Sequence, residues 1–443
     1  MTAEISILNK SAVALATDSA VTISYGTEAQ KIYESADKLF EASTSQPIGI
    51  MIYNGMSFME MPIPTIVKDF RRLGRTFDTI QAAGQAFLEY LNDEAQDSPN
   101  EVVRRSNEAA VRDLVHGIFD DISRPEVTMQ ILDSLGAEGR DEFVSAYNDL
   151  LRVQLKTQLA HYDEVNPANF VGGGVPQFTK TLKETYLSLI SDRFQSIELE
   201  EATIELFVTL CGLVMKGERL SSGYTGIVVA GFGKSEKFPT LVSYQIDGIV
   251  GGRLKYIETH NIDIDRIGHV AKVIPFAQKE MVDRFVYGID ESVTSGIIDT
   301  CRKGMEEFCS NLASSVNIND TEQSILAAAG AAGKQAFLSK LKNDAIQSIR
   351  ERSQKEIEDM VSFMPKPEMA NMAEALVGLT SIKRRVSRGM ETVGGPIDVA
   401  IISREDGFVW VRRKHYFSAE QNIRYGLRKS KTIQNQGGNN DAQ

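Results

Sequence analysis

The hydrophobic and polar positions near the beginning of the chain predict short strands joined by tight turns. Glu4–Leu8 and Ala12–Thr17 are rich in β-favourable residues, and Asn9-Lys10 between them is a turn signal. A second turn signal, Asn54-Gly55, ends this part of the chain. Further strands are expected at Asp18–Tyr25, Lys38–Phe40 and Ile48–Tyr53.

A helical pattern replaces the strand pattern from Pro64 onwards. In Thr79–Leu91, apolar residues recur at the spacing of one helix face. Helical periodicity persists, with interruptions, to about Lys216, and a second helical block extends over residues 278–378. Another helix is expected at Met372–Arg388.

Strand patterns return between the two helical blocks and again after the second one. The expected strands are Thr225–Phe232, Thr240–Ile246 and Leu254–Glu258, followed near the end by a hairpin of Ile397–Ser403 and Phe408–Arg412. The order of strands, helices, strands, helices and strands is typical of layered sheets flanked by helices. It differs from the strict alternation of a parallel α/β fold.

The composition of the 443-residue chain narrows the classes of function. Its formal charge of −12 gives no electrostatic support for binding nucleic acid. The three cysteines, Cys211, Cys301 and Cys309, form no CxxC pair, which favours a reducing compartment over a disulfide framework. No clustered Cys/His spacing indicates a zinc site, so neither a metal nor a cofactor is expected.

Two further features bear on location. The segment MTAEISILNK has no basic stretch followed by an apolar one, and no apolar run reaches the length of a membrane span. The sequence therefore predicts a cytoplasmic protein with no membrane partner. The tail over residues 429–443 is polar and is predicted to be disordered.

Thr2 is the first candidate for chemistry. Methionine aminopeptidase removes Met1 when the next side chain is small, so Thr2 could become the mature N-terminus. A terminal threonine has a nucleophilic hydroxyl and an α-amine, whose ordinary pKa of about 8 allows it to take the hydroxyl proton. Threonine is common at this position, so the residue alone does not indicate an activity.

Several short motifs accompany Thr2 in a defined order. In Thr2–Thr22, a strand that begins with threonine, a tight turn and a second strand precede Asp18, which stands sixteen residues after Thr2. Ala36–Phe40 contains a lysine followed by Leu-Phe, and Gly49–Gly55 is an apolar strand that ends in a glycine turn. In this order the motifs resemble the opening of a proteasome β-subunit, which is an N-terminal-nucleophile (Ntn) hydrolase.

Later segments extend the resemblance, which covers roughly residues 2–60, 224–260 and 372–412. Val228–Gly231, Leu241–Asp247 and Gly251-Gly252 are similar to the family's third and fourth strands. Gly394–Ile402 and Asp406–Phe408 are similar to its terminal hairpin. The resemblance implies an α+β fold: a four-layer αββα sandwich of two antiparallel sheets, here with enlarged outer helical layers.

The resemblance also implies a role for each site residue. Thr2 would be the nucleophile, and Lys38 would lower the proton affinity of its hydroxyl. Asp18 would pair with Lys38 and hold it in place; the alternative is a structural salt bridge between these two residues. A backbone N–H of Asn54 or Gly55 would stabilise the oxyanion.

Three apolar residues would line a specificity pocket by the same resemblance: Val21, Ile52 and Met56. Ordinary core packing is an equally good explanation for them.

The chain departs from the family at several positions. No Gly-Ser-Gly turn follows the fourth strand near Val273–Phe276. Met390 and Val393 stand where the family has an Asp and a Ser that bond the amine and the catalytic acid, although Glu391-Thr392 offers polar side chains next to them. The lysine lies four residues later than the family spacing, so the loop before it must be longer.

The chain is about twice as long as a subunit of this family requires, and the surplus lies in the helical blocks. The expected division assigns residues 2–75 to the first part of the Ntn core, 76–220 to a helical insertion and 221–277 to the central strands. It assigns 278–370 to a second helical block, 371–428 to the last core helix and terminal hairpin, and 429–443 to the tail.

Two functions follow from the resemblance. The first is a threonine hydrolase that acts on a peptide or a small amide once Met1 is removed. The second is a catalytically inactive, proteasome-like subunit that serves as an oligomeric scaffold. Either would form a homo-oligomer, and since no GxxxxGKS segment is present, a separate ATPase chain would supply any ATP-driven step.

Overall fold

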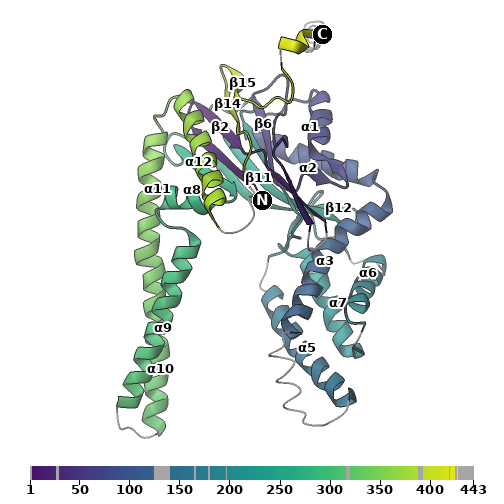
Figure 1. Cartoon of the computed structure of the whole chain (residues 1–443), viewed down its shortest axis with the longest axis vertical. Helices are drawn as coiled ribbons and strands as arrows, with labels where there is room; N and C mark the ends of the chain where they lie inside the picture. The colour runs from purple at the N-terminus through teal and green to yellow at the C-terminus, as the bar shows by residue number, and fades with distance from the viewer. Residues whose placement is uncertain are drawn as a thin grey trace.

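The computed structural model describes residues 2–25, 29–123, 140–163, 166–177, 180–195, 197–315, 320–387, 393–418, 420–424 and 427. Its centre is formed by two antiparallel sheets (Figure 1). The five-stranded sheet has the order β13 (Ala271–Ala277), β1 (Ala3–Asn9), β2 (Ala12–Thr17), β14 (Asp398–Ser403) and β15 (Gly407–Arg412). The six-stranded sheet has the order β5 (Leu39–Glu41), β6 (Ile48–Asn54), β10 (Thr225–Gly231), β11 (Thr240–Val250), β12 (Arg253–Asp263) and β9 (Asn169–Phe170).

Two small hairpins stand apart from these sheets. β3 (Val21–Tyr25) pairs with β4 (Ala29–Tyr33), and β7 (Ser57–Phe58) pairs with β8 (Met61–Pro62). The β3–β4 hairpin connects the end of β2 to the segment that carries Lys38.

Twelve helical elements are described in the chain outside the sheets, apart from a short turn at Glu420–Asn422. The elements before β10 are α1 (Ile63–Arg72), α2 (Ile80–Gln96), α3 (Asn100–Ile122), α5 (Arg140–Asp163), α6 (Lys180–Arg193) and α7 (Glu201–Lys216). Those after β13 are α8 (Glu280–Tyr287), α9 (Glu291–Ser315), α10 (Asp320–Lys340), a π-helical turn (Leu341–Ile346), α11 (Gln347–Val361) and α12 (Lys366–Val386).

One apolar cluster joins the facing sides of the two sheets. Leu15 of β2, Met51 of β6 and Val228 of β10 belong to it and are fully buried. Successive side chains of a strand point to opposite faces, so the neighbours of these residues face outward from the pair of sheets. On the outer side of the five-stranded sheet, Ile5 and Ile7 share a cluster with α12.

The outer side of the six-stranded sheet packs against other helices. Ile50 and Ile52 of β6 share a cluster with Phe87 and Leu91 of α2 and with residues of α1. Burying these faces on both sides of the sheets accounts for the continuous apolar runs in the central strands.

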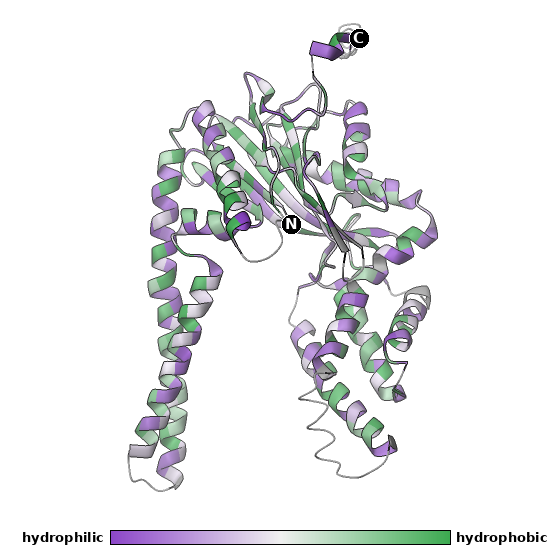
Figure 2. Cartoon of the chain, viewed as in Figure 1, coloured by the Kyte–Doolittle hydropathy of each residue, from purple (hydrophilic) through white to green (hydrophobic). Residues whose placement is uncertain are grey.

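The two helical blocks extend beyond the sheets in the same direction in Figure 1. The block of α3, α5, α6 and α7 has an apolar cluster of its own, which includes Leu151 and Phe207. In the other block, α9 and α10 form a long hairpin that leaves Phe308 and Ile325 more than 60% exposed. Figure 2 shows apolar residues gathered in the strands, whereas polar and apolar residues are mixed along α9–α11.

Most of the elements predicted from the sequence are present, but several differ. The short strands β4, β7, β8 and β9 were not predicted, and β11 and β12 are longer than predicted. The predicted strand at Asp18–Tyr25 begins only at Val21. β13 was not predicted as a strand; its Pro275 is tolerated because β13 is the edge strand and needs no ladder hydrogen bond on its outer side. α12 begins at Lys366, six residues earlier than predicted, with Pro367 in its first turn.

The predicted disordered tail lies outside the described residues. Within the described part of the chain, no helix combines the length and the apolar character needed to cross a membrane.

Candidate active site

Thr2 and Asp18 are brought together by the hairpin of β1 and β2. Glu4 pairs with Thr17 in this ladder, so Asp18 lies opposite Ala3, next to Thr2. The Asn9 side chain fixes the turn because its Oδ1 accepts the backbone N–H groups of Ser11 and Ala12. The sixteen-residue separation of the two candidate residues is therefore a consequence of the register of one tight hairpin.

Lys38 reaches the same place from the other sheet. Its backbone carbonyl accepts the N–H of Ile52 in β6. Its Nζ lies 2.7 Å from Asp18 Oδ1, and both side chains are 0% exposed. The Lys38 side chain thus connects the two sheets through a buried ion pair, which lies between the end of β2 and the beginning of β5.

The Asp18 carboxylate is held by four donors. Oδ1 accepts from Lys38 Nζ at 2.7 Å and from the N–H of Ala3 at 3.1 Å. Oδ2 accepts from the N–H of Ala20 at 3.2 Å and from that of Gly394 at 3.0 Å. Together these four donors fix the position and orientation of the carboxyl group. The contact with Gly394 ties the segment before β14 to the beginning of the chain.

Glu4 is a member of the site that the sequence prediction missed. Its Oε2 accepts the Thr2 hydroxyl at 3.0 Å, and its Oε1 accepts the Thr17 hydroxyl at 3.3 Å. Lys38 Nζ lies 3.8 Å from the same Oε1. The available signal was a charged residue inside an apolar strand, two positions from Thr2 and hence on the same face.

Burial raises the pKa of Glu4 to about 8, although the nearby Lys38 charge lowers it in part. The Asp18 charge acts in the same direction as burial. The cluster contains two carboxyl groups, Glu4 and Asp18, and one cation, Lys38, all fully buried. With both carboxyl groups ionised, the cluster has one negative charge that no cation balances. Binding of a proton by Glu4 would remove this excess charge.

Thr2 itself is 1% exposed in the full chain, in which its amine forms the peptide bond to Met1. Its carbonyl accepts the N–H of Gln278 at 3.1 Å. Gln278 follows Ala277, whose φ of 59° is in the left-handed region. The turn after β13 thus lies beside Thr2, directly after the Val273–Phe276 stretch near which the resemblance places this turn.

Two tyrosines lie near Glu4 on the side of the six-stranded sheet. Burial raises the pKa of Tyr53 to about 12, and the Glu4 charge adds to this. The pKa of Tyr224 is raised by burial and by the same Glu4 charge. The rings of Tyr53 and Tyr224 meet edge to face with centroids 6.4 Å apart. These two aromatic rings therefore lie on the side of Glu4 that faces β6 and β10.

The predicted oxyanion donors lie at the end of β6, next to the rings of Tyr53 and Tyr224. The Gly55 N–H is donated to the carbonyl of Tyr224 at 3.1 Å. Asn54 has a φ of 65°, and its side-chain amide donates to the carbonyls of Ser222 and Tyr224. Gly55 would have to leave its partner in order to bind an oxyanion, so its role remains a prediction.

Two of the three predicted pocket residues belong to the cluster on the outer side of the six-stranded sheet. Ile52 is fully buried in the cluster between β6 and α2, and Met56 packs against that cluster. Val21 begins β3 and is half-buried. Tyr53, whose side chain points to the opposite face from Ile52, is the β6 residue near Glu4.

The positions where the chain departs from the proteasome pattern are described in part. Met390 and Glu391-Thr392 lie outside the described residues. Val393 is fully buried in the cluster under α12, and its neighbour Gly394 supplies the N–H that binds Asp18.

Comparisons with known proteins find no relative. No protein-family model matches the chain, and no curated protein matches it in sequence.

Proposed function

We propose that this chain is a proteasome-type Ntn hydrolase that cleaves a peptide or a small amide with the Thr2 hydroxyl after loss of Met1. The observation that carries the proposal is the buried Asp18–Lys38 ion pair beside Thr2. The order of these three residues and the sixteen-residue separation of Thr2 and Asp18 resemble those of the proteasome β-subunit, although Lys38 lies four residues later than in that family.

The arrangement of the sheets supports the four-layer αββα part of the proposal. One apolar cluster joins the two sheets, and each outer face shares a cluster with helices. In this fold the long helical blocks would be enlargements of the outer layers, consistent with a homo-oligomer and a separate ATPase partner.

The proposed reaction begins with the Thr2 oxygen attacking the carbonyl carbon of the amide. As the C–O bond forms, the hydroxyl proton passes to a basic group beside Thr2, and the Lys38 side chain favours the developing alkoxide. Asp18 holds the Lys38 side chain in position. Transfer of a proton to the leaving nitrogen breaks the C–N bond and leaves an ester on Thr2, which water then hydrolyses.

An inactive scaffold is the second candidate, and one observation favours it. Thr2 is 1% exposed, and the Asp18–Lys38 pair would stabilise the junction of the two sheets without any reaction. The fold would then present its helical blocks for assembly.

Covalent labelling separates the two functions. Intact-mass analysis of the purified full chain is expected to show loss of Met1, and a β-lactone is expected to acylate the wild-type protein once. Thr2→Ala should not be acylated, whereas Thr2→Ser, which keeps a hydroxyl, should be. Retention of Met1, or equal acylation of wild type and Thr2→Ala, would contradict the hydrolase and leave the scaffold.

A further inference from the structure

We infer that Glu4 is a catalytic residue that takes the proton from the Thr2 hydroxyl. This inference rests on the proposed function and assigns one step of it to a side chain. Thr2 donates its hydroxyl hydrogen to Glu4 Oε2 at 3.0 Å, so the acceptor is already in contact with the atom that would attack.

The surroundings of Glu4 fit a proton acceptor. Thr17 donates to its other oxygen at 3.3 Å, which fixes the orientation of the carboxyl group. The charged groups that face it are Lys38 and Asp18, and the titratable groups on the other side are Tyr53 and Tyr224. Loss of Met1 would add the α-amine of Thr2, whose ordinary pKa is about 8 and which Glu4→Gln leaves in place. Burial raises the pKa of Glu4 to about 8, close to the range in which a general base both binds and releases a proton.

The charge balance of the cluster points to the same role. Asp18 already neutralises Lys38 through their 2.7 Å contact, so the Glu4 carboxylate has no full counter-charge of its own. Receiving the hydroxyl proton makes Glu4 neutral, which burial favours. Glu4 then gives this proton to the leaving nitrogen, and it accepts another from the water that cleaves the ester.

Labelling rates of the full chain with Met1 absent test this role. Glu4→Gln keeps the shape of the side chain but cannot accept the proton, and it is expected to slow acylation by a β-lactone about 100-fold or more. Ser6→Ala is the matched control, because Ser6 is a buried residue on the same face whose hydroxyl has no hydrogen-bond partner. It should label at the wild-type rate.

The pH profile distinguishes a catalytic Glu4 from a merely structural one. The wild-type labelling rate should rise with pH as Glu4 ionises, and Glu4→Gln should remove that rise. Glu4→Asp keeps a carboxyl group and should therefore label more slowly but with the same rise with pH. This variant shows whether the loss of the rise in Glu4→Gln comes from the missing carboxyl group or from misfolding. A wild-type rate and profile in Glu4→Gln would overturn the role of Glu4 alone, whereas absence of labelling in the wild type would overturn the hydrolase.

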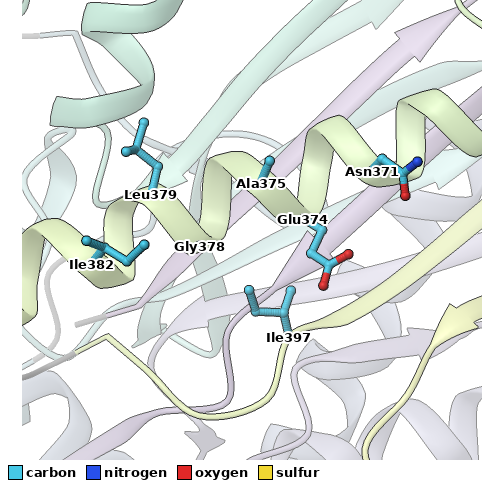
Figure 3. A pocket seen from close by; sticks show the side chains of 7 residues that line it. All are labelled: Asn371, Glu374, Ala375, Gly378, Leu379, Ile382 and Ile397. Carbon is cyan, nitrogen blue, oxygen red and sulfur yellow. The ribbon is translucent and has the colours of Figure 1, made fainter.

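The face of α12 that points away from the five-stranded sheet carries no further proposal. Leu379, Ile382 and Val386 on this face are 38%, 60% and 77% exposed. Figure 3 shows the residues that line the hollow beside it, which include the polar Asn371 and Glu374 and enclose a volume of about 470 Å³. Nothing in the described chain shows what covers this face.

Discussion

Lys38→Met is expected to lower the free energy of unfolding by about 3–5 kcal/mol, because it leaves buried carboxylates without their cation. Lys38 Nζ lies 2.7 Å from Asp18 Oδ1 and 3.8 Å from Glu4 Oε1, and none of the three side chains is exposed. Methionine fills a similar space but carries no charge, so the carboxyl groups must take up protons or remain unpaired. Urea denaturation of wild type and variant at neutral pH measures the difference.

Lys366→Met provides the matched control for this substitution. Lys366 also forms two ion pairs, with Glu405 and Asp406, but its side chain is 28% exposed and those of its partners are 86% and 54% exposed. Solvent screens such pairs, so the loss should stay below about 1 kcal/mol. Equal losses at Lys38 and Lys366 would show that the Lys38 cluster is not a buried, charge-balanced unit.

Asp18→Ala is expected to be at least as destabilising as Lys38→Met, that is by about 3–5 kcal/mol or more. The substitution leaves Glu4, 3.8 Å away, as the remaining carboxyl group beside Lys38 Nζ, and it also removes the acceptor for three backbone N–H groups. An unsatisfied buried donor costs about 1–3 kcal/mol. Because one of those donors belongs to Gly394, the loss should also loosen the segment before β14, which hydrogen exchange of the β14 amides can detect.

Asp37→Ala tests whether the effect is particular to Asp18. Asp37 is 51% exposed and lies 3.5 Å from Lys414, so its removal should change stability little. If Asp18→Ala unfolded at the same urea concentration as Asp37→Ala, the four-donor arrangement around Asp18 would contribute nothing to folding.

The sequence predicted the parts of the site that depend on local register. Asn9-Lys10 marks a tight turn, and a tight turn between two β-favourable runs fixes which residues lie opposite each other. Asp18 therefore had to lie near Thr2. Lys38 was placed there by resemblance to a family, since nothing local in its own segment determines where its side chain points.

The sequence could not assign the faces of the strands in the same way. Ile52 and Tyr53 are adjacent and both apolar in character, and only the packing of α2 on one side and the five-stranded sheet on the other decides which faces the site. A strand buried on both sides shows no polar alternation that would distinguish its faces.

The sequence by itself determined the strand and helix blocks and the β1–β2 register, because turn chemistry and apolar periodicity act over short distances. Only the tertiary structure decided that Glu4 joins Thr2, Asp18 and Lys38, and that Gly394 and Gln278 close around them. The physical reason is burial: excluding water from the junction of two sheets raises the pKa of Glu4, and that exclusion depends on segments hundreds of residues apart.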